Sequence, residues 1–193
     1  MELSNLKSLS DLRTIYENED QFAQILMNNG GVDKIGGPGD IIEVYETAFH
    51  AKYGKGYTGK DIQWWFGGIS RSTRKCFGLF VENRDKKTLM RGFKKHVHKD
   101  SIIYSDEWRG YISVGEYFAQ HCTVNHSQGF INSNGIHTNN IESLWGRLKK
   151  PLKQANGTTD RLIENYLYDQ LAHEMLGDEY MSAILVEMRK YLV

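Results

Sequence analysis

The chain has 193 residues, enough for one domain with a hydrophobic core and too few for two comfortable ones. Hydrophobic residues make up 40% of the sequence and aromatic residues 12%, a composition that excludes intrinsic disorder. The 24 Lys and Arg residues balance the 24 Asp and Glu residues, so only local patches of charge can indicate a nucleic-acid partner.

The sequence contains no cysteine pair typical of a metal site and no segment typical of a membrane or secreted protein. The cysteines Cys76 and Cys122 form no CxxC pair, which favours a reducing compartment and argues against a zinc site. No apolar run reaches the ~20 residues of a membrane span, and the first residues do not resemble a signal peptide. We therefore expect a protein that is neither secreted nor in a membrane, located in the nucleus if eukaryotic and otherwise in the cytoplasm.

The first half of the chain predicts a helical lead-in and then an antiparallel meander. Residues 1–29 carry apolar side chains at helical spacing, and we interpret 1–34 as the remnant of an upstream region. After a turn at Gly36–Gly39, three segments rich in strand-forming residues follow. These strands are predicted at 40–49, 62–70 and 76–81, with a glycine- and lysine-rich loop at 52–60 and a turn at 71–75.

The second half alternates helices and strands. A helix capped by the segment Asn83-Arg-Asp85 and ending near residue 97 leads to a strand at 102–105, and this crossover predicts pairing parallel to the first strand. Beyond it we expect a helix at 111–118, a strand at 122–124, a polar loop at 125–138, and helices beginning at 139, 160 and 183. This order predicts an α/β domain over 35–193, a ribonuclease-H-like mixed sheet with helices on both faces.

Two acids stand at positions that suit a divalent cation. Asp106 ends the fourth predicted strand and Glu142 lies in the first turn of a later helix, and carboxylate oxygens are preferred ligands of Mg²⁺. Each acid also has an ordinary structural interpretation. Asp106 can cap a turn, and Asn139 as N-cap with Glu142 three residues later forms a capping box. The pattern alone leaves both interpretations open.

Basic residues gather on two predicted helices, where a solvated helix face and a patch for DNA phosphates are the alternatives. Lys149 and Lys153 share a helix face with Asn139 and Glu142. The candidate DNA-binding residues are Lys149, Lys150, Lys153, Arg147, Lys86, Lys87 and Lys94. His126 and His137, in the polar loop, fit either a self-hydrogen-bonded loop or a metal ligand.

Six collinear blocks in this sequence resemble the Merlin-type DDE transposases and the related bacterial insertion-sequence transposases. The resemblance covers roughly residues 33–176, and its last block contains His137-Thr-Asn-Asn-Ile-Glu-Ser-Leu-Trp145. The blocks are Ile35 to Phe49, Trp65 to Ile69, Lys75 to Phe77, Ile103 to Tyr111, Thr123 to Ser127, and His137 to Trp145.

The resemblance implies a catalytic domain that cleaves and transfers DNA strands in cut-and-paste transposition, using Mg²⁺ or Mn²⁺ held by three acids. Asp106 matches the second acid and Glu142 the third, Asn139 lies in the same block, and Lys149 fits a basic position after the third acid. The implied partners are transposon ends, target DNA and a second copy of the chain, since strand transfer joins two ends.

The first catalytic acid is the point at which this sequence departs from the family. Tyr45 stands where the family has Asp, and a phenol with a pKa near ~10 is a poor Mg²⁺ ligand. Glu43 shares the strand face of Tyr45 but lies about 6.6 Å away along the strand, whereas Glu46 points to the opposite face. The sequence therefore predicts impaired catalysis. The alternative is an inactive, domesticated module that binds DNA or supports assembly, and the sequence leaves open whether the chain is an enzyme.

Overall fold

The computed structural model describes residues 34–50, 62–125, 135–158 and 160–180, together with residues 182, 183 and 186. The chain divides into two compact units: residues 33–160 form one, and residues 1–32 with 161–193 form the other. The predicted sheet and the candidate site lie in the first unit. Within the described ranges no helix is both long and apolar enough to cross a membrane.

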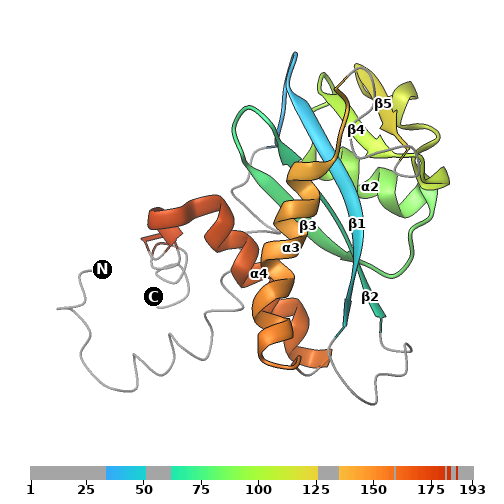
Figure 1. The fold of residues 1–193 in the computed structure, drawn as a ribbon. Coiled ribbons are helices and arrows are strands. Elements are labelled where there is room, and N and C mark those ends of the chain that lie inside the picture. The colour runs from blue at the N-terminus through green and yellow to red at the C-terminus, as the bar shows by residue number, and fades with distance from the viewer. Residues whose placement is uncertain are drawn as a thin grey trace. The chain divides into compact units, whose positions relative to one another are not determined.

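A five-stranded mixed sheet forms the centre of the first unit (Figure 1). Strands β1 (Ile41–His50), β2 (Ile62–Ser70) and β3 (Cys76–Val81) form an antiparallel meander. Strands β4 (Ile102–Asp106) and β5 (Gln120–Val124) extend the sheet in parallel from the other edge of β1. The strand order β3-β2-β1-β4-β5 confirms the predicted ribonuclease-H-like sheet, with Asp106 as the last residue of β4.

One face of the sheet packs on helix α2 (Lys86–His96). Asp85 caps this helix as predicted, because its side chain accepts a hydrogen bond from the backbone N–H of Thr88. The helix contributes Leu89 and Phe93 to a continuous apolar core. The strand residues of this core include Ile42, Val44, Phe66, Phe77 and Ile103. The edge-to-face contact of Phe66 with Phe93 joins β2 directly to α2.

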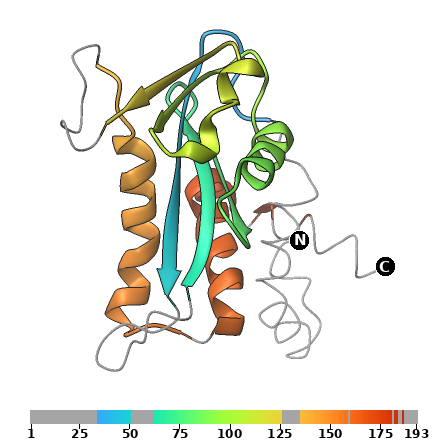
Figure 2. The same ribbon diagram turned by 90° about the vertical axis from the view of Figure 1, so that its right-hand side faces the viewer.

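The opposite face of the sheet is covered by helix α3 (Asn139–Gln154), as Figure 2 shows. Its buried side chains recur at steps of three and four. They are Ile141, Leu144, Trp145, Leu148 and Leu152. Trp145 packs edge-to-face against Phe49, and its Nε1 donates to the backbone carbonyl of Tyr45 at 3.3 Å. Helices on both faces of the sheet are thereby confirmed.

The helix predicted at 111–118 is wrong. The chain forms two 3₁₀ helices there, η2 (Arg109–Tyr111) and η3 (Val114–Glu116), separated by Ile112 with 77% of its surface exposed. Tyr111 and Val114 are buried three residues apart, a spacing that places them on one side of a 3₁₀ turn. Burial of these two side chains against α2 and β5 overrides the α-helical preference of the segment.

Helix α4 (Asp160–Leu176) belongs to the second unit and starts where its sequence predicts. Ile163, Leu167 and Leu171 are buried, whereas Leu162 is 44% exposed. A short 3₁₀ helix, η4 (Gly177–Glu179), follows. The predicted lead-in at 1–29, the loop at 52–60, most of the loop at 125–138 and most of the helix at 183–192 lie outside the described residues.

Substitution of Gly67 in β2 is a test of how closely α3 packs on the sheet. A Cβ atom at this position would lie 2.5 Å from the carbonyl oxygen of Phe77 and 2.6 Å from the Trp145 ring. We expect Gly67→Ala to lower the free energy of unfolding by about 2 kcal/mol, measured by urea denaturation. In the control Gly146→Ala, the new Cβ meets nothing within 4 Å. The control should gain stability, by up to about 1 kcal/mol, because Ala favours a helix interior. Equal stability of the two variants would contradict this packing.

Candidate active site

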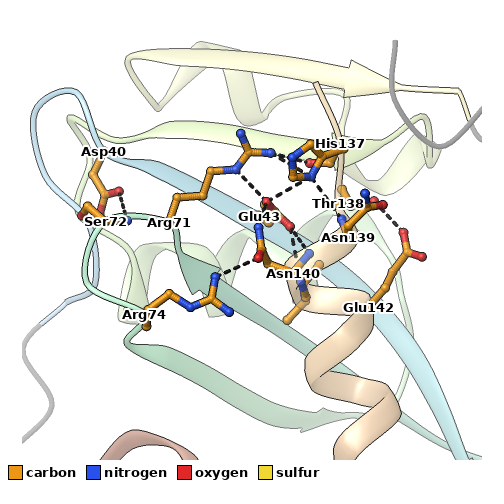
Figure 3. Close-up of polar contacts among 11 residues, drawn as sticks. Asp40, Glu43, Arg71, Ser72, Arg74, His137, Thr138, Asn139, Asn140 and Glu142 are labelled. Carbon is orange, nitrogen blue, oxygen red and sulfur yellow. Dashed lines mark hydrogen bonds and ion pairs between the residues drawn. The ribbon is translucent and has the colours of Figure 1, made fainter. Parts of the chain in front are cut away.

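A buried carboxylate, that of Glu43 on β1, joins three separate parts of the chain (Figure 3). Its Oε1 accepts hydrogen bonds from Arg71 Nε and from Asn140 Nδ2, both at 2.6 Å. Its Oε2 accepts from the backbone N–H groups of Asn140 at 2.7 Å and Ile141 at 3.3 Å. Both oxygens of this completely buried acid are therefore occupied by protein donors.

Arg71 and Arg74 extend this network from the turn after β2 to the loop before α3. The Arg71 Nη2 atom lies 3.0 Å from His137 Nδ1 and donates to the His137 carbonyl at 3.1 Å. The guanidinium also lies over the Tyr104 ring of β4, at 4.8 Å from its centroid. Arg74, which has a positive φ of 63°, donates to Asn140 Oδ1 at 2.8 Å. The N-terminus of α3 is thus anchored to two strands and a turn.

The capping box predicted for Asn139 and Glu142 is wrong. Thr138 is the N-cap of α3, Asn139 is the first helical residue, and Glu142 accepts a hydrogen bond from the Thr138 hydroxyl at 2.8 Å. The first-turn N–H groups of Asn140 and Ile141 bond to Glu43. A carboxylate from a distant strand therefore caps the helix. Its negative charge also interacts favourably with the positive end of the helix dipole.

The three positions predicted from the family resemblance, Tyr45, Asp106 and Glu142, lie close together. The parallel register sets Glu43 opposite Tyr104, and Tyr45 and Asp106 each follow two residues later on their strands. Side chains two residues apart on a strand share a face, so Tyr45 and Asp106 lie on the same face of the sheet as Glu43 and Tyr104. Burial, then the charges of Asp106, Glu142 and Glu46, raise the pKa of the Tyr45 phenol above 10.0. The phenol therefore stays protonated at neutral pH.

Glu46 is the second buried acid of β1 and differs from Glu43 in its environment. It lies on the opposite face of the strand, is only 5% exposed, and its Oε1 has no hydrogen-bond partner among the described residues. Burial, together with the nearby charge of Asp106, raises its pKa to about 7, although the facing Tyr111 hydroxyl opposes this shift. Glu46 is therefore partly protonated at neutral pH.

These donors do not fit a two-metal centre. Among the residues that the structure describes, no three His, Cys, Asp or Glu side chains form a group that could hold a metal ion. Asp106 and Glu142 supply two carboxylates, a protonated phenol stands beside them, and both Glu43 oxygens are engaged elsewhere. Hard divalent cations need several oxygen ligands, so two carboxylates and a phenol form a poor site.

The predicted DNA-binding residues lie on two different faces of the sheet. Arg147, Lys150 and Lys153 are exposed on α3, and Lys86, Lys87 and Lys94 are exposed on α2. Lys149 is different, because its Nζ donates to Thr47 Oγ1 at 2.5 Å and lies 5.2 Å from the Phe49 ring centroid. Burial, with a smaller effect of Lys153, lowers its pKa to about 8. Lys149 therefore connects α3 to β1.

Similarity to a known protein family shows the lineage of the chain. Residues 45–171 match the family of ISXO2-like transposase domains. The chain belongs to this family. A Haemophilus influenzae protein described as an uncharacterized transposase-like protein is 33% identical over 95 residues, which make up 48% of this chain and 75% of that protein. This domain is therefore a DDE transposase domain.

Viral integrase structures also resemble this transposase domain. The catalytic core of HTLV-2 integrase in complex with magnesium has a TM-score of 0.43 and 11% identity over 70% of this chain and 84% of that chain. The catalytic core of BIV integrase has a TM-score of 0.44 and 13% identity over 78% of this chain and 97% of that chain.

Sequence reasoning missed the roles of Glu43, Arg71 and His137 in this transposase domain. The sequence indicates Glu43 only as an acid on the strand face of Tyr45 and His137 as a loop residue or metal ligand, whereas both lie in the network that holds α3. One signal was present in the sequence, because an acid flanked by Ile42 and Val44 within a buried strand requires a compensating partner. The partners themselves are 28 and 94 or more residues away and left no local pattern.

Loss of the Glu43 carboxylate should destabilise the domain strongly. Glu43→Gln leaves the half-buried Arg71 without its anion, so we expect a loss of about 3 kcal/mol in the free energy of unfolding. Urea denaturation followed by tryptophan fluorescence measures this loss. The control Glu107→Gln removes an exposed acid that accepts one hydrogen bond, from Asn125, and should change stability by less than about 0.5 kcal/mol. A similar, small change in both variants would contradict the anchoring role of Glu43.

The raised pKa of Glu46 predicts a specific pH dependence of stability. The folded-state pKa of Glu46, about 7, exceeds the ordinary value of 4.5. The contribution of protonated Glu46 to the free energy of unfolding is therefore complete below pH 4.5 and is lost as the pH rises through 7. At about 1.4 kcal/mol per pKa unit, the loss is about 3 kcal/mol. We expect Glu46→Gln to lack this loss and to exceed the unaltered chain in stability at pH 8. Urea denaturation at several pH values, with the exposed Glu82→Gln as control, measures it. Parallel curves for all three chains would refute the assignment.

Proposed function

We propose that this DDE transposase domain binds DNA but is impaired in cleaving it, because Tyr45 occupies the position of the first catalytic acid. The observation that carries the proposal is that the charges of both Asp106 and Glu142 act on the Tyr45 phenol. Metal-dependent strand cleavage needs a cation that binds the attacking and leaving oxygens. A protonated phenol contributes no charge to hold it.

Two features argue that the impairment is confined to this position. Asp106 and Glu142 are retained at the end of β4 and in the first turn of α3, where the family resemblance requires the second and third acids. The network around Glu43 holds the first turn of α3, including Asn139 and Asn140, against β1. We propose that a carboxylate at position 45 would complete a Mg²⁺ or Mn²⁺ site with Asp106 and Glu142.

Within the ISXO2-like family we propose a Merlin-type domain, on the strength of the six collinear sequence blocks. The partners proposed for it are transposon ends, target DNA and a second copy of the chain. The basic residues of α2 and α3 support DNA binding, since exposed lysines and arginines are the usual contacts of DNA phosphates. Such contacts need no metal, so the domain can bind DNA even where it does not cut. This metal-free binding is also what the alternative function, a domesticated DNA-binding or assembly module, requires.

Restoration of the missing acid tests the proposal. We expect the unaltered chain to leave a labelled DNA duplex intact with Mn²⁺, and Tyr45→Asp to cleave it, because the third carboxylate completes the cation site. The variant should also gain stability on addition of Mn²⁺, measured as a rise in Tm, because a ligand that binds the folded state stabilises it. Gel analysis of the labelled strands and thermal unfolding supply the two readouts.

The matched control is Glu142→Gln in the Tyr45→Asp background, which should lose both cleavage and the Mn²⁺-dependent rise in Tm. Cleavage by the unaltered chain that disappears with Glu142→Gln would overturn the proposed impairment. Failure of Tyr45→Asp to bind Mn²⁺ or to cut would show that the loss extends beyond residue 45. If no form of the chain bound DNA, the proposed DNA-binding function itself would fail.

A further inference from the structure

A hollow of about 630 Å³ lies beside the candidate site, between the start of α2 and the chain after β4. Its lining includes Arg84, Lys86 and Arg109, with Asp85 as its one acid. Asp85 is engaged as the N-cap of α2, where it accepts a hydrogen bond from Thr88 N at 2.7 Å. Trp108 and the exposed Ile112 supply the apolar part of the wall. The hollow is therefore strongly basic in a chain whose formal net charge is zero.

Trp108 holds two guanidinium groups in place. The Arg84 guanidinium lies 3.6 Å from the Trp64 ring centroid and 4.6 Å from that of Trp108, and the Arg109 guanidinium lies 5.5 Å from Trp108. The Trp108 Nε1 also donates to the Arg84 carbonyl at 3.0 Å. Among the described residues neither arginine forms an ion pair. A stacked guanidinium keeps its edge N–H groups for other acceptors, and phosphate is the acceptor that its geometry fits.

This basic hollow is connected to the candidate site through Trp108 and Arg84. The backbone N–H of Trp108 donates to Asp106 Oδ1 at 3.0 Å, so the hollow begins two residues from that acid. Burial and neighbouring carboxylates raise the pKa of Tyr45, and the positive charge of Arg84 opposes them. A group bound between Arg84 and Arg109 would lie next to the position where a strand would be cut.

A second hollow of about 480 Å³ continues along α2 and shares Lys86 with the first. Its lining adds Lys87, Lys94 and Tyr117, and the Lys94 Nζ lies 4.8 Å from the Tyr117 ring centroid. Together the two hollows present five Lys and Arg side chains against Asp85 and Glu116. A row of cations that extends away from one acid matches a polymer of regularly spaced anions better than a single small ligand.

We propose that these two hollows bind the sugar-phosphate backbone of one DNA strand, which passes from Asp106 over Trp108 and along α2. The proposal rests on the proposed DNA-binding function and specifies where the strand lies. Arg84 and Arg109 hold the phosphate nearest the site, Lys86, Lys87 and Lys94 hold those that follow, and Ile112 contacts sugar or base. The exposed cations of α3, Lys150 and Lys153, lie outside this path.

Salt-dependent DNA binding by the full chain tests the path. The probe is a fluorescein-labelled duplex with a single-stranded overhang, measured by anisotropy between about 50 and 200 mM salt. We expect Lys86→Gln with Arg109→Gln to weaken binding at least tenfold and to reduce the slope of log K against log salt by about 1.8, because each lost phosphate contact contributes about 0.9. The control, Lys75→Gln with Lys99→Gln, removes the same charge from exposed sites and should leave the slope unchanged.

The other outcomes separate this proposal from the proposed function. If Lys150→Gln with Lys153→Gln reduces the slope and the α2 double variant does not, DNA binding stands and the α2 path is wrong. If the unaltered chain does not bind the duplex, both proposals fail. Equal binding of poly-glutamate and DNA would identify a general polyanion surface and overturn the assignment to a DNA strand. Unchanged thermal unfolding of each variant shows that the loss arises from the removed contacts.

Discussion

The buried carboxylate of Glu43 is the interaction on which the arrangement of the candidate site depends. A charged group transferred into a protein interior loses several kcal/mol of hydration, which only close partners can offset. Here the partners are the Arg71 guanidinium, the Asn140 amide and two N–H groups at the start of α3. Because no other described donor takes their place, the helix can start only where its first turn meets β1. That requirement holds the first turn of α3, which carries Glu142, against β1.

The cost of burying a carboxyl group is met differently at the two buried acids of β1. Glu43 engages both oxygens with protein donors, whereas Glu46, on the other face, has a raised pKa of about 7 and one oxygen without a hydrogen-bond partner among the described residues. Tyr45 lies between them in the strand, and the charges of Asp106 and Glu142 act on its phenol. A neutral side chain at position 45 avoids a third negative charge at a place that holds two acids. The same neutral side chain cannot serve as the ligand that a divalent cation would need. Tyr45 therefore lowers the repulsion among the acids and also lowers the affinity of the site for a metal ion.

Charge on this domain is organised by face, although the whole chain is formally neutral. The acids of the candidate site lie at the edge where β1 and β4 run side by side, and cations border them on both sides. On the α3 side, Lys149 is held against Thr47 and Phe49, so its charge supports packing. On the α2 side, Arg84 and Arg109 are held by Trp108 and keep their donors available. Aromatic stacking therefore distinguishes cations that are ready to bind from cations used in the fold.

The sheet, its strand order and the positions of both main helices followed from local patterns in the chain, because strand propensity, capping residues and helical periodicity act over a few residues. The alignment of Tyr45, Asp106 and Glu142 came from collinear blocks, which carry the geometry of the family. Three features needed the tertiary structure: the 3₁₀ turns at 109–116, the N-cap of α3 at Thr138, and the network of Glu43. Each is set by partners distant in sequence, such as the 97 positions between Glu43 and Asn140. Burial against such partners outweighs local preference. For that reason the sequence identified the candidate acids of the site, whereas only the tertiary structure determined which carboxylates are already engaged by protein donors.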